Sequence, residues 1–280
     1  MGKFDGVLLA SDFDNTLVYT ERALRSGEEI PELSAKNRAA MEYYMREGGY
    51  FAIATGRALP GFISFAPGIP MNAPGVVCNG AAIYDFQKNE YIEAALLQES
   101  AREQGQELLD RFPAVACEAY HIENVIHAVQ PNEITRRHQH MTHVDVVEEP
   151  SLREVPLPLG KLLFEGTHED LLAAKAFLEE RGWAINYELI FSSPFLLEMT
   201  VKGANKGGMV KKLAAYLGVA AQNIYCVGDE ANDLSMLAVS AIPFAPANCV
   251  PAVRESGAYL VAHAEQGAVA DVIGILDGRY

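Results

Sequence analysis

Continuous apolar runs alternate with amphipathic stretches in the first part of the chain. Three of these runs have the length of buried strands: residues 6–12, 50–56 and 75–81. Residues 34–49 have the pattern of a helix, for which Ser34 is a suitable N-cap and Gly48 a suitable C-terminal stop. Continuous apolar strands separated by helices are typical of a parallel sheet with both faces covered.

The same alternation returns after about residue 200. Helix-like and strand-like stretches follow one another there, beginning with a helix: residues 205–218, 223–229, 233–240, 241–245, 250–257 and 258–262. We therefore expect residues 1–84 and 200–280 to form one core, an α/β fold with a doubly wound, Rossmann-like parallel sheet.

Between these two parts, the pattern changes to a helix followed by two adjacent strands, and it does so twice. The first unit comprises residues 98–112, 114–120 and 124–130, and the second comprises residues 168–182, 183–191 and 195–201. Hairpins of this kind do not extend a parallel sheet readily, because their strands are antiparallel. We expect residues 85–199 to form a separate α+β cap domain that is inserted into the core and sets substrate specificity.

The overall charge narrows the range of partners. The 280 residues include 37 acidic and 22 basic side chains, which gives a net charge of −15. Because such a field repels phosphate backbones and anionic lipid, we expect no nucleic-acid partner and no membrane partner, and no obligate protein partner is evident. The four cysteines lie far apart in apolar surroundings, which favours buried thiols in a reducing compartment and hence a cytoplasmic location.

Candidate chemistry begins at the end of the first expected strand, in the stretch DFDNT. Asp12 and Asp14 lie there one residue apart, at the carboxyl end where parallel sheets bind ligands. Two carboxylates at such a place repel each other unless a cation joins them, and Mg²⁺ prefers oxygen ligands of this kind. The alternative is a turn or capping role, which short polar residues such as Asp12 and Asn15 often have at strand ends.

Three further stretches are expected at the same edge of the sheet. ATGR ends the second strand and supplies the Thr55 hydroxyl, NKGG opens a helix and supplies Lys206, and GDEAND ends a later strand with Asp229, Asn232 and Asp233. A hydroxyl, an ammonium group and a helix N-terminus are all suited to phosphate oxygens. Together with DFDNT, four such stretches in order favour a phosphoryl-transfer site over a set of unrelated turns.

The stretches DFDNTL, ATGR, NKGG and GDEAND resemble, in order, the four motifs of the haloacid dehalogenase superfamily of phosphohydrolases. VVCNGAAIYD before the insert and FAPANCVPAVRESGAYLV after it resemble the Cof-type branch, which has a large α/β cap between its second and third motifs. The resemblance covers nearly the whole chain.

The resemblance implies a mechanism and a role for each motif residue. Asp12 is implied as the nucleophile that forms an aspartyl-phosphate, and Asp14 as the group that protonates the leaving oxygen and later accepts a proton from water. Thr55 and Lys206 are implied as stabilisers of the transferring phosphoryl group. The implied Mg²⁺ ligands are Asp12, Asp14 through its backbone carbonyl, Asp229 and Asp233, and the implied substrate-binding residues are Thr55, Gly56, Arg57, Asn79 and Asn232.

The resemblance therefore implies a Mg²⁺-dependent phosphomonoesterase for a small phosphorylated metabolite, with a sugar phosphate as the expected substrate. A phosphomutase of the same superfamily and a non-catalytic protein that binds a phosphate ligand are the alternatives. The chain departs from the usual Cof-type motifs at Asn15, where glycine is usual, and at Glu230 and Ala231. Arg57 has two possible roles, either contact with the substrate or pairing with a carboxylate.

The cap contains one basic stretch, EITRRHQHMTH. It includes Arg136, Arg137, His138, His140 and His143, which could present cations to a second anionic group of the substrate. The alternative is a solvated helix face. A zinc site is the weaker hypothesis, because no nearby carboxylate or cysteine completes a ligand set.

Overall fold

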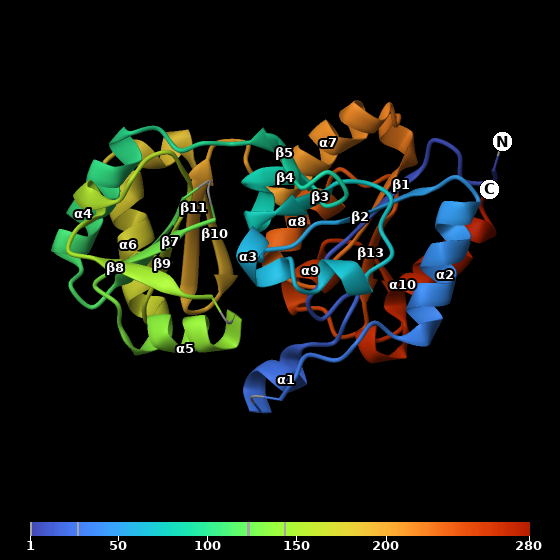
Figure 1. Ribbon diagram of the computed structural model, residues 1–280, viewed down its shortest axis with the longest axis horizontal. Helices are drawn as coiled ribbons and strands as arrows, with labels where there is room; N and C mark the ends of the chain where they lie inside the picture. The colour runs from blue at the N-terminus through green and yellow to red at the C-terminus, as the bar shows by residue number, and fades with distance from the viewer. Residues whose placement is uncertain (1, 27, 122–123, 143) are drawn as a thin grey trace.

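The computed structural model describes residues 2–26, 28–121, 124–142 and 144–280, and it consists of two parts that lie side by side (Figure 1). The larger part is built on a five-stranded sheet with the order β14-β13-β12-β1-β2, in which every neighbouring pair is parallel. Its strands are β1 (Leu8–Ser11), β2 (Tyr50–Ile53), β12 (Ile224–Val227), β13 (Pro243–Pro246) and β14 (Tyr259–Val261). The central strand, β1, thus has neighbours from both ends of the chain.

Both faces of this sheet are covered, as the continuous apolar runs predicted. Leu9 packs into a cluster with α2 (Ala35–Arg46) and α10 (Ala268–Asp277), whereas Leu8 packs into a second cluster with α7 (Lys206–Leu217). Neighbouring residues of a strand point to opposite faces. The shorter helices of this part are α1 (Glu21–Ser26), α3 (Leu59–Phe62), α8 (Leu234–Leu237) and α9 (Pro251–Glu255). The predicted α/β fold class is therefore confirmed.

The third expected strand touches the parallel sheet only at the end of β2, through one parallel bridge among the described residues. β3 (Gly75–Val77) instead pairs antiparallel with β4 (Ala82–Asp85), which pairs with β5 (Glu90–Ala94). A single bridge between Ala54 and Val76 connects this three-stranded sheet to the end of β2. The turn from β3 into β4 is too short for the crossover that a parallel neighbour requires, so the two strands form a hairpin.

The smaller part has a six-stranded sheet with the order β10-β11-β9-β6-β7-β8. Its strands are β6 (Ala116–His121), β7 (Ile126–Val129), β8 (Val146–Glu149), β9 (Leu159–Glu165), β10 (Tyr187–Ser193) and β11 (Leu196–Val201). The helices α4 (Ser100–Arg111) and α6 (His168–Glu180) cover its outer face, and α5 (Glu133–Thr142) lies at the bottom of this part in Figure 1, where it contacts strand β6. The two expected helix-and-hairpin units are present, but β9 lies between them at the centre of the sheet.

The strands of the smaller part divide their side chains strictly between the two faces. In β6, Cys117 and Ala119 pack against the outer helices, so Glu118 and Tyr120 point the other way. The same alternation in β9 and β11 brings Lys161 and Glu198 to the face opposite these helices. This face is directed at the larger part of the molecule (Figure 1).

The end of the three-stranded sheet indicates where the cap begins. β5 pairs with β4, and the apolar cluster of the smaller part includes Leu97 and continues to Met199. We therefore propose that the cap spans residues 97–201, about a dozen residues later at its start than the sequence suggested.

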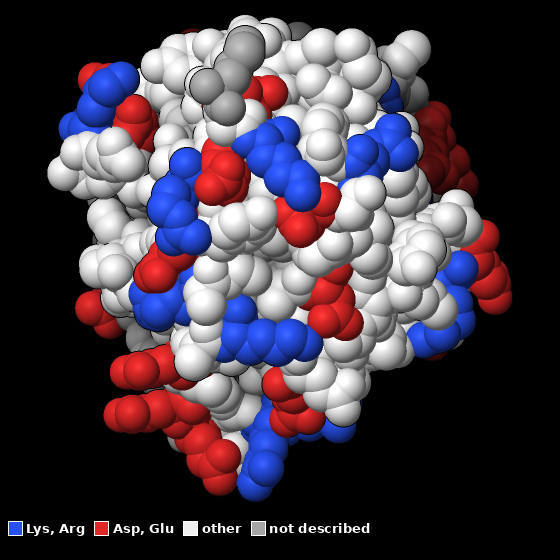
Figure 2. All heavy atoms as spheres, turned by 90° about the vertical axis from the view of Figure 1, so that its right-hand side faces the viewer, with Lys and Arg blue, Asp and Glu red and all other residues white. Residues whose placement is uncertain are grey.

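The end of the core furthest from the cap has acidic and basic side chains mixed with uncharged ones (Figure 2). Two ion pairs involve the outer helices of this region: Lys3–Asp277, at 2.9 Å, joins the N-terminal segment to α10, and Lys36–Asp271, at 2.9 Å, joins α2 to α10. Within the described ranges, no helix is long and apolar enough to cross a membrane.

Candidate active site

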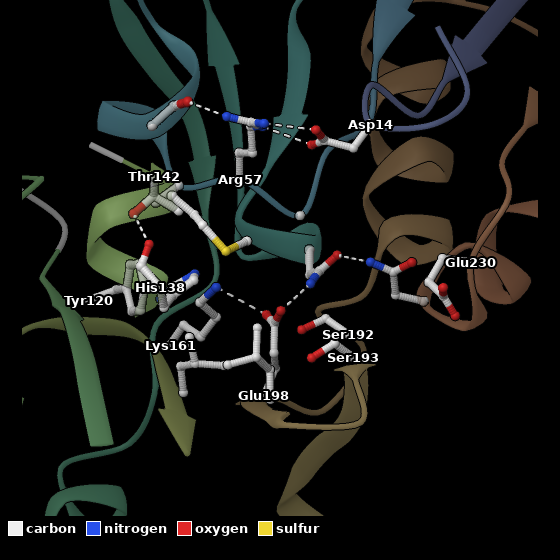
Figure 3. Close-up of a pocket in the computed structure, with 18 of the residues that line it drawn as sticks. Asp14, Arg57, Tyr120, His138, Thr142, Lys161, Ser192, Ser193, Glu198 and Glu230 are labelled. Carbon is white, nitrogen blue, oxygen red and sulfur yellow. Dashed lines mark hydrogen bonds and ion pairs between the residues drawn. The ribbon is translucent and has the colours of Figure 1, made fainter. Parts of the chain in front are cut away.

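The loops that follow β1, β2 and β12 meet above the carboxyl edge of the core sheet. They form one side of a cavity of about 350 Å³, and the polar face of the cap sheet forms the other side (Figure 3). The core side includes Asp12, Asp14, Gly56, Arg57, Asn79, Asp229, Glu230 and Asn232. Thr55, Lys206 and Asp233 lie directly behind this wall and are almost fully buried.

Lys206 joins two of the predicted carboxylates. Its ammonium group donates to Asp12 Oδ1 and to Asp233 Oδ1, each at 2.6 Å, and only 1% of the residue is exposed. Burial opposes the charge of Lys206, but the two carboxylates outweigh this and raise its pKa. Lys206 is the first residue of α7, whose N-cap, Asn205, accepts a hydrogen bond from the Gly208 amide at 2.8 Å.

Asp12 and Asp229 are buried close to each other at this point. Carboxylate oxygens of Asp12, Asp229 and Asp233 all lie within 4.8 Å of one another. Burial raises the pKa of Asp12 to about 7, although Lys206 opposes this, and burial together with Asp12 raises the pKa of Asp229 well above its usual value. Carboxyl groups in such surroundings are stabilised in their charged form by a cation.

Asp233 acts mainly as a support for its neighbours. Its Oδ2 accepts hydrogen bonds from the amides of Asp229 at 2.9 Å and Glu230 at 3.0 Å, while its Oδ1 is bound to Lys206. The Thr16 hydroxyl donates to Asp229 Oδ1 at 2.9 Å and so fixes the other carboxylate. Asp233 is therefore held in place by contacts that use both of its oxygens. The hydrogen bonds of Asp12 and Asp229 within the described part of the chain use only one carboxylate oxygen of each.

Arg57 pairs with Asp14. Its Nε donates to Asp14 Oδ2 at 2.8 Å and its Nη2 to Asp14 Oδ1 at 2.7 Å, which is the two-pronged geometry of strong carboxylate pairs (Figure 3). The Thr20 hydroxyl also donates to Asp14 Oδ1, at 2.7 Å. The guanidinium lies against the rings of Phe13 and Phe65, at 5.3 and 5.0 Å from their centroids. Of the two roles considered for Arg57, the structure shows the carboxylate pairing.

The departure from glycine at Asn15 has a backbone explanation. Asn15 has a φ of 55°, in the left-handed region that glycine adopts most readily and asparagine next. Its side-chain oxygen accepts hydrogen bonds from the amides of Thr20 at 3.1 Å and Glu21 at 2.8 Å. The loop after Asp14 is thus stabilised by a side chain that glycine would lack.

The second motif lies beside the first. Thr55 is fully buried, and its hydroxyl oxygen accepts a hydrogen bond from the Arg57 amide at 3.1 Å, which leaves the hydroxyl proton free to be donated. Gly56 lines the cavity, and a Cβ at this position would approach the Asn79 side chain to 3.0 Å. Close packing around this turn therefore favours glycine.

Asn79 connects the core to the cap. It lies in the turn between β3 and β4 with a φ of 54°, and its amide donates to the Thr55 carbonyl at 3.1 Å. Asn232 Nδ2 donates to Asn79 Oδ1 at 2.8 Å, and Asn79 Nδ2 donates to Glu198 Oε1 on β11 of the cap (Figure 3). Glu198 Oε2 in turn lies 3.0 Å from Lys161 Nζ. A continuous chain of polar contacts thus runs from the fourth motif to the cap sheet.

Among the described basic residues of the stretch, His138 alone lies in the cavity wall, where Met141 and Thr142 of the same stretch also lie. Its Nδ1 lies 3.1 Å from Glu118 Oε2 and 3.2 Å from Glu165 Oε1, and both glutamates are buried. Burial opposes the charge of this imidazole, but the two carboxylates outweigh it and raise the pKa of His138 to about 9. The same contacts lower the pKa of Glu118 despite its burial. His138 is therefore a cation at neutral pH.

The other described basic residues of the stretch lie outside the cavity wall. Arg136, Arg137 and His140 are exposed on α5, and none of them is part of the cavity wall. His143 lies outside the described residues. The hypothesis that Arg136 and Arg137 face the site is therefore wrong in this structure, because the helix turns them to solvent while the same turn of helix directs His138 inward.

Sequence reasoning missed the polar residues of the cap that face the core, chiefly Glu118, Lys161 and Glu198. A signal for them existed in the strands ACEAYH, LGKLLFE and LLEMTV, where a charged residue is flanked by apolar ones. Such a residue in an otherwise apolar strand is either on a solvated face or in a buried polar site.

Known proteins resemble this chain over nearly its full length. The family described as haloacid dehalogenase-like hydrolase matches residues 9–273. A 5-amino-6-(5-phospho-D-ribitylamino)uracil phosphatase of Bacillus subtilis is 24% identical over 253 residues, covering 90% of this chain and 88% of the relative. A pyridoxal phosphate phosphatase of Escherichia coli is 23% identical over 274 residues, covering 95% of this chain and 97% of the relative.

Among solved structures, a sugar phosphatase of subclass IIB of the superfamily has a TM-score of 0.80 at 20% identity, and the match covers 97% of this chain and 99% of that one. This likeness shows a shared fold. The chain belongs to the haloacid dehalogenase-like hydrolase family, as its four motifs predicted, and its enzyme class is that of the phosphatases.

Proposed function

We propose that this protein is a Mg²⁺-dependent phosphomonoesterase that hydrolyses a small phosphorylated metabolite, a sugar phosphate, through an aspartyl-phosphate on Asp12. The observation that carries the proposal is the Asp12 carboxylate, which is bound by the Lys206 ammonium group at 2.6 Å in the wall of a cavity shared with the cap. A carboxylate fixed beside a buried cation is suited to attack an anionic phosphoryl group, because the cation offsets the repulsion between them.

The residues present fit a bound Mg²⁺ ion. Asp12 and Asp229 are buried carboxyl groups with raised pKa values, and Lys206 is the cation bound directly to Asp12. We propose that Asp12, Asp229 and the Asp14 backbone carbonyl hold the ion, with Asp233 supporting them through the amides of its own loop. When bound, the ion supplies positive charge next to the transferring phosphoryl group.

In the first step, an Asp12 oxygen forms a bond to phosphorus while the bond from phosphorus to the leaving oxygen breaks. Asp14 gives that oxygen a proton, so the leaving group departs as an alcohol. In the second step, Asp14 takes a proton from water, whose oxygen attacks phosphorus and releases Asp12 and inorganic phosphate. Thr55, with a hydroxyl proton free to be donated, and Lys206 stabilise the phosphoryl oxygens in both steps.

The substrate class is supported by the cavity and by the named relatives. A volume of about 350 Å³ accommodates a small metabolite. The relatives described above are named as phosphatases for phosphorylated small molecules: a ribityl phosphate, pyridoxal phosphate and, for the solved structure, sugar phosphates.

The proposal is tested by measuring inorganic phosphate released from p-nitrophenyl phosphate and from a panel of sugar phosphates. We expect EDTA to abolish release, Mg²⁺ to restore it, and Asp12→Asn to remove it. Asp110→Asn is the matched control, because Asp110 is an exposed carboxylate on α4 far from the cavity wall. Turnover that survives either EDTA or Asp12→Asn contradicts the mechanism.

The same assay separates hydrolysis from phosphoryl transfer to a second sugar. A phosphomonoesterase releases one phosphate for each substrate consumed, also when an acceptor sugar phosphate is present. Isomerised sugar phosphate without phosphate release would indicate the phosphomutase instead.

A further inference from the structure

Among the residues that the structure describes, the cap side of the cavity contains two cations, and each is paired with a carboxylate. Lys161 is 2% exposed, and its ammonium group lies 3.0 Å from Glu198 Oε2 and 4.2 Å from the centroid of the Tyr120 ring. His138 lies between Glu118 and Glu165, as described above. Each cation in this wall thus has a buried carboxylate within about 3.2 Å, and the exposed Arg136 and Arg137 lie outside the wall.

The same wall offers hydrogen-bond acceptors to a ligand. No donor among the described residues forms a hydrogen bond with Asn232 Oδ1, although this oxygen is buried and its residue lines the cavity. Glu198 Oε2 is also buried without a well-oriented donor. Buried acceptors of this kind are costly unless a ligand or water donates to them. A ligand that brings hydroxyl protons satisfies them, whereas a phosphate dianion has no proton to donate.

We propose that the leaving group of the substrate is uncharged and carries hydroxyl groups, and that the Glu198–Lys161 pair binds these hydroxyls and excludes a second phosphate. This inference rests on the proposed function, since it concerns the part of the substrate beyond the transferred phosphate. It replaces the expectation that basic residues of the cap recognise a second anionic group.

The exclusion has a simple physical basis. A second phosphate near Lys161 has to compete with Glu198 for the ammonium group. It also adds a buried anion to a wall that already holds Glu198, with the buried Glu118 behind His138. Desolvating an anion without a free cation is expensive. A hydroxyl group, in contrast, donates to Glu198 and accepts from Lys161, whose ammonium group has three protons.

The rest of the cap wall combines apolar side chains with the hydroxyl groups of Thr142, Ser192 and Ser193. Ile126, Leu163 and Leu196 line the cavity next to the pair. A sugar has one face of C–H groups and edges of hydroxyls, so it matches a wall in which apolar side chains lie beside the Glu198–Lys161 pair and neutral hydroxyl groups.

The first test compares matched substrates with the full-length wild-type protein and Mg²⁺. We expect kcat/KM for fructose 6-phosphate to exceed that for fructose 1,6-bisphosphate at least tenfold. The kcat/KM for ribose 5-phosphate should likewise be at least tenfold higher than that for pentyl phosphate, which lacks hydroxyls. A bisphosphate or an alkyl phosphate that is hydrolysed as well as its partner overturns the inference.

The second test uses two substitutions with opposite expected effects. Glu198→Gln keeps an acceptor for Asn79 but frees the charge of Lys161, so we expect the preference for the monophosphate to fall at least fivefold. Lys161→Gln leaves Glu198 uncompensated, so the same preference should rise. The matched controls are Glu188→Gln and Lys202→Gln, because Glu188 and Lys202 form an equivalent pair, 3.4 Å apart, outside the cavity wall.

The outcomes distinguish the inference from the function on which it rests. If p-nitrophenyl phosphate is hydrolysed but the preference is absent, or if Glu198→Gln leaves it unchanged, the inference is wrong and the phosphatase stands. If no phosphomonoester releases phosphate, both are wrong. Should Glu198→Gln fail to fold, the wild-type comparison and Lys161→Gln still decide.

Discussion

Arg57 holds the Asp14 carboxylate by two hydrogen bonds, of 2.8 Å from Nε and 2.7 Å from Nη2. The two residues come from the loops after β2 and β1, and Asp14 is the proposed acid and base. Since both Asp14 oxygens accept hydrogen bonds, this arrangement holds Asp14 as a carboxylate, the form that accepts a proton from water. One bond to Arg57 has to open before Asp14 can carry the proton for the leaving oxygen. Arg57 is therefore a positioning residue for Asp14.

We expect Arg57→Ala to lower kcat/KM for a sugar phosphate at least tenfold and to affect p-nitrophenyl phosphate less, because an aryl leaving group needs little protonation. Asp14→Asn should show the same selectivity, and the double variant should be no worse than Asp14→Asn alone. Arg46→Ala is the control, since Arg46 lies at the end of α2 against Tyr43. Equal losses on both substrates, or additive effects, would show that Arg57 does not act through Asp14.

Lys206 is expected to matter for both activity and stability. Lys206→Met removes the only cation bound directly to Asp12 among the described residues and leaves two buried carboxylates unpaired. We expect kcat on p-nitrophenyl phosphate to fall at least about hundredfold and the free energy of unfolding to fall by about 3 kcal/mol. Urea denaturation and steady-state kinetics measure the two effects. The control is Lys211→Met, because Lys211 is exposed on the same helix. Normal turnover of Lys206→Met would exclude Lys206 from catalysis.

The His138 cluster gives the folded protein a specific dependence on pH. Because the pKa of His138 is raised to about 9, from about 6.5 in the unfolded chain, its charged form stabilises the fold fully below about pH 6.5. This contribution is lost as the pH rises through 9. We expect the difference in unfolding free energy between wild type and His138→Gln to shrink by about 3 kcal/mol between pH 6 and pH 10.

The measurement is urea denaturation of both proteins across this pH range. His168→Gln provides the comparison with an exposed histidine, which lies on α6 and contacts the Pro194 carbonyl. If the difference in unfolding free energy between wild type and His138→Gln is the same at every pH, His138 is not held as a cation by Glu118 and Glu165.

Arg136 and Arg137 are expected to have no part in substrate selection, because both are exposed and outside the cavity wall. The double substitution to alanine should leave the order of sugar phosphates unchanged and each kcat/KM within about twofold, a difference of roughly 0.4 kcal/mol. The same panel of substrates serves for this measurement. A changed order would mean that α5 can turn these side chains toward the substrate.

The core and its reactive residues could be predicted because each signal is local. A buried strand, its polar end and the next helix N-cap lie within a few residues of one another, as in the stretch from Leu8 to Asp14 and in the Asn205 cap. Parallel strands then bring their carboxyl ends together, so Asp12 and Asp229 had to meet. The hypothesis of a cation at this place needed no knowledge of side-chain positions.

The cap could be predicted only in outline, because the strand register decides which of its polar side chains face the cavity. Glu118 and Glu198 both pair in register with Leu163 on β9, the strand that the sequence did not indicate. Lys161 looks like a solvent-facing residue until β9 is known to be the central strand. The Asp14–Arg57 pair, 43 residues apart, likewise depends on how two loops pack.

The position of β1 at the centre of the core sheet has a consequence for how the protein is made. Its neighbour β2 follows within the first fifth of the chain, but its other neighbour, β12, is synthesised much later. The contacts that complete the site join residues 194 and 213 positions apart, Lys206 to Asp12 and Thr16 to Asp229. During synthesis, the cap is therefore complete before the nucleophile has any of its partners, and a ribosome-bound chain that stops before residue 206 exposes one edge of β1 for a chaperone or for aggregation. We expect activity to appear in one step, when the last quarter of the chain folds onto β1 and β2. This step should be slow, because it closes loops over such long distances in the sequence.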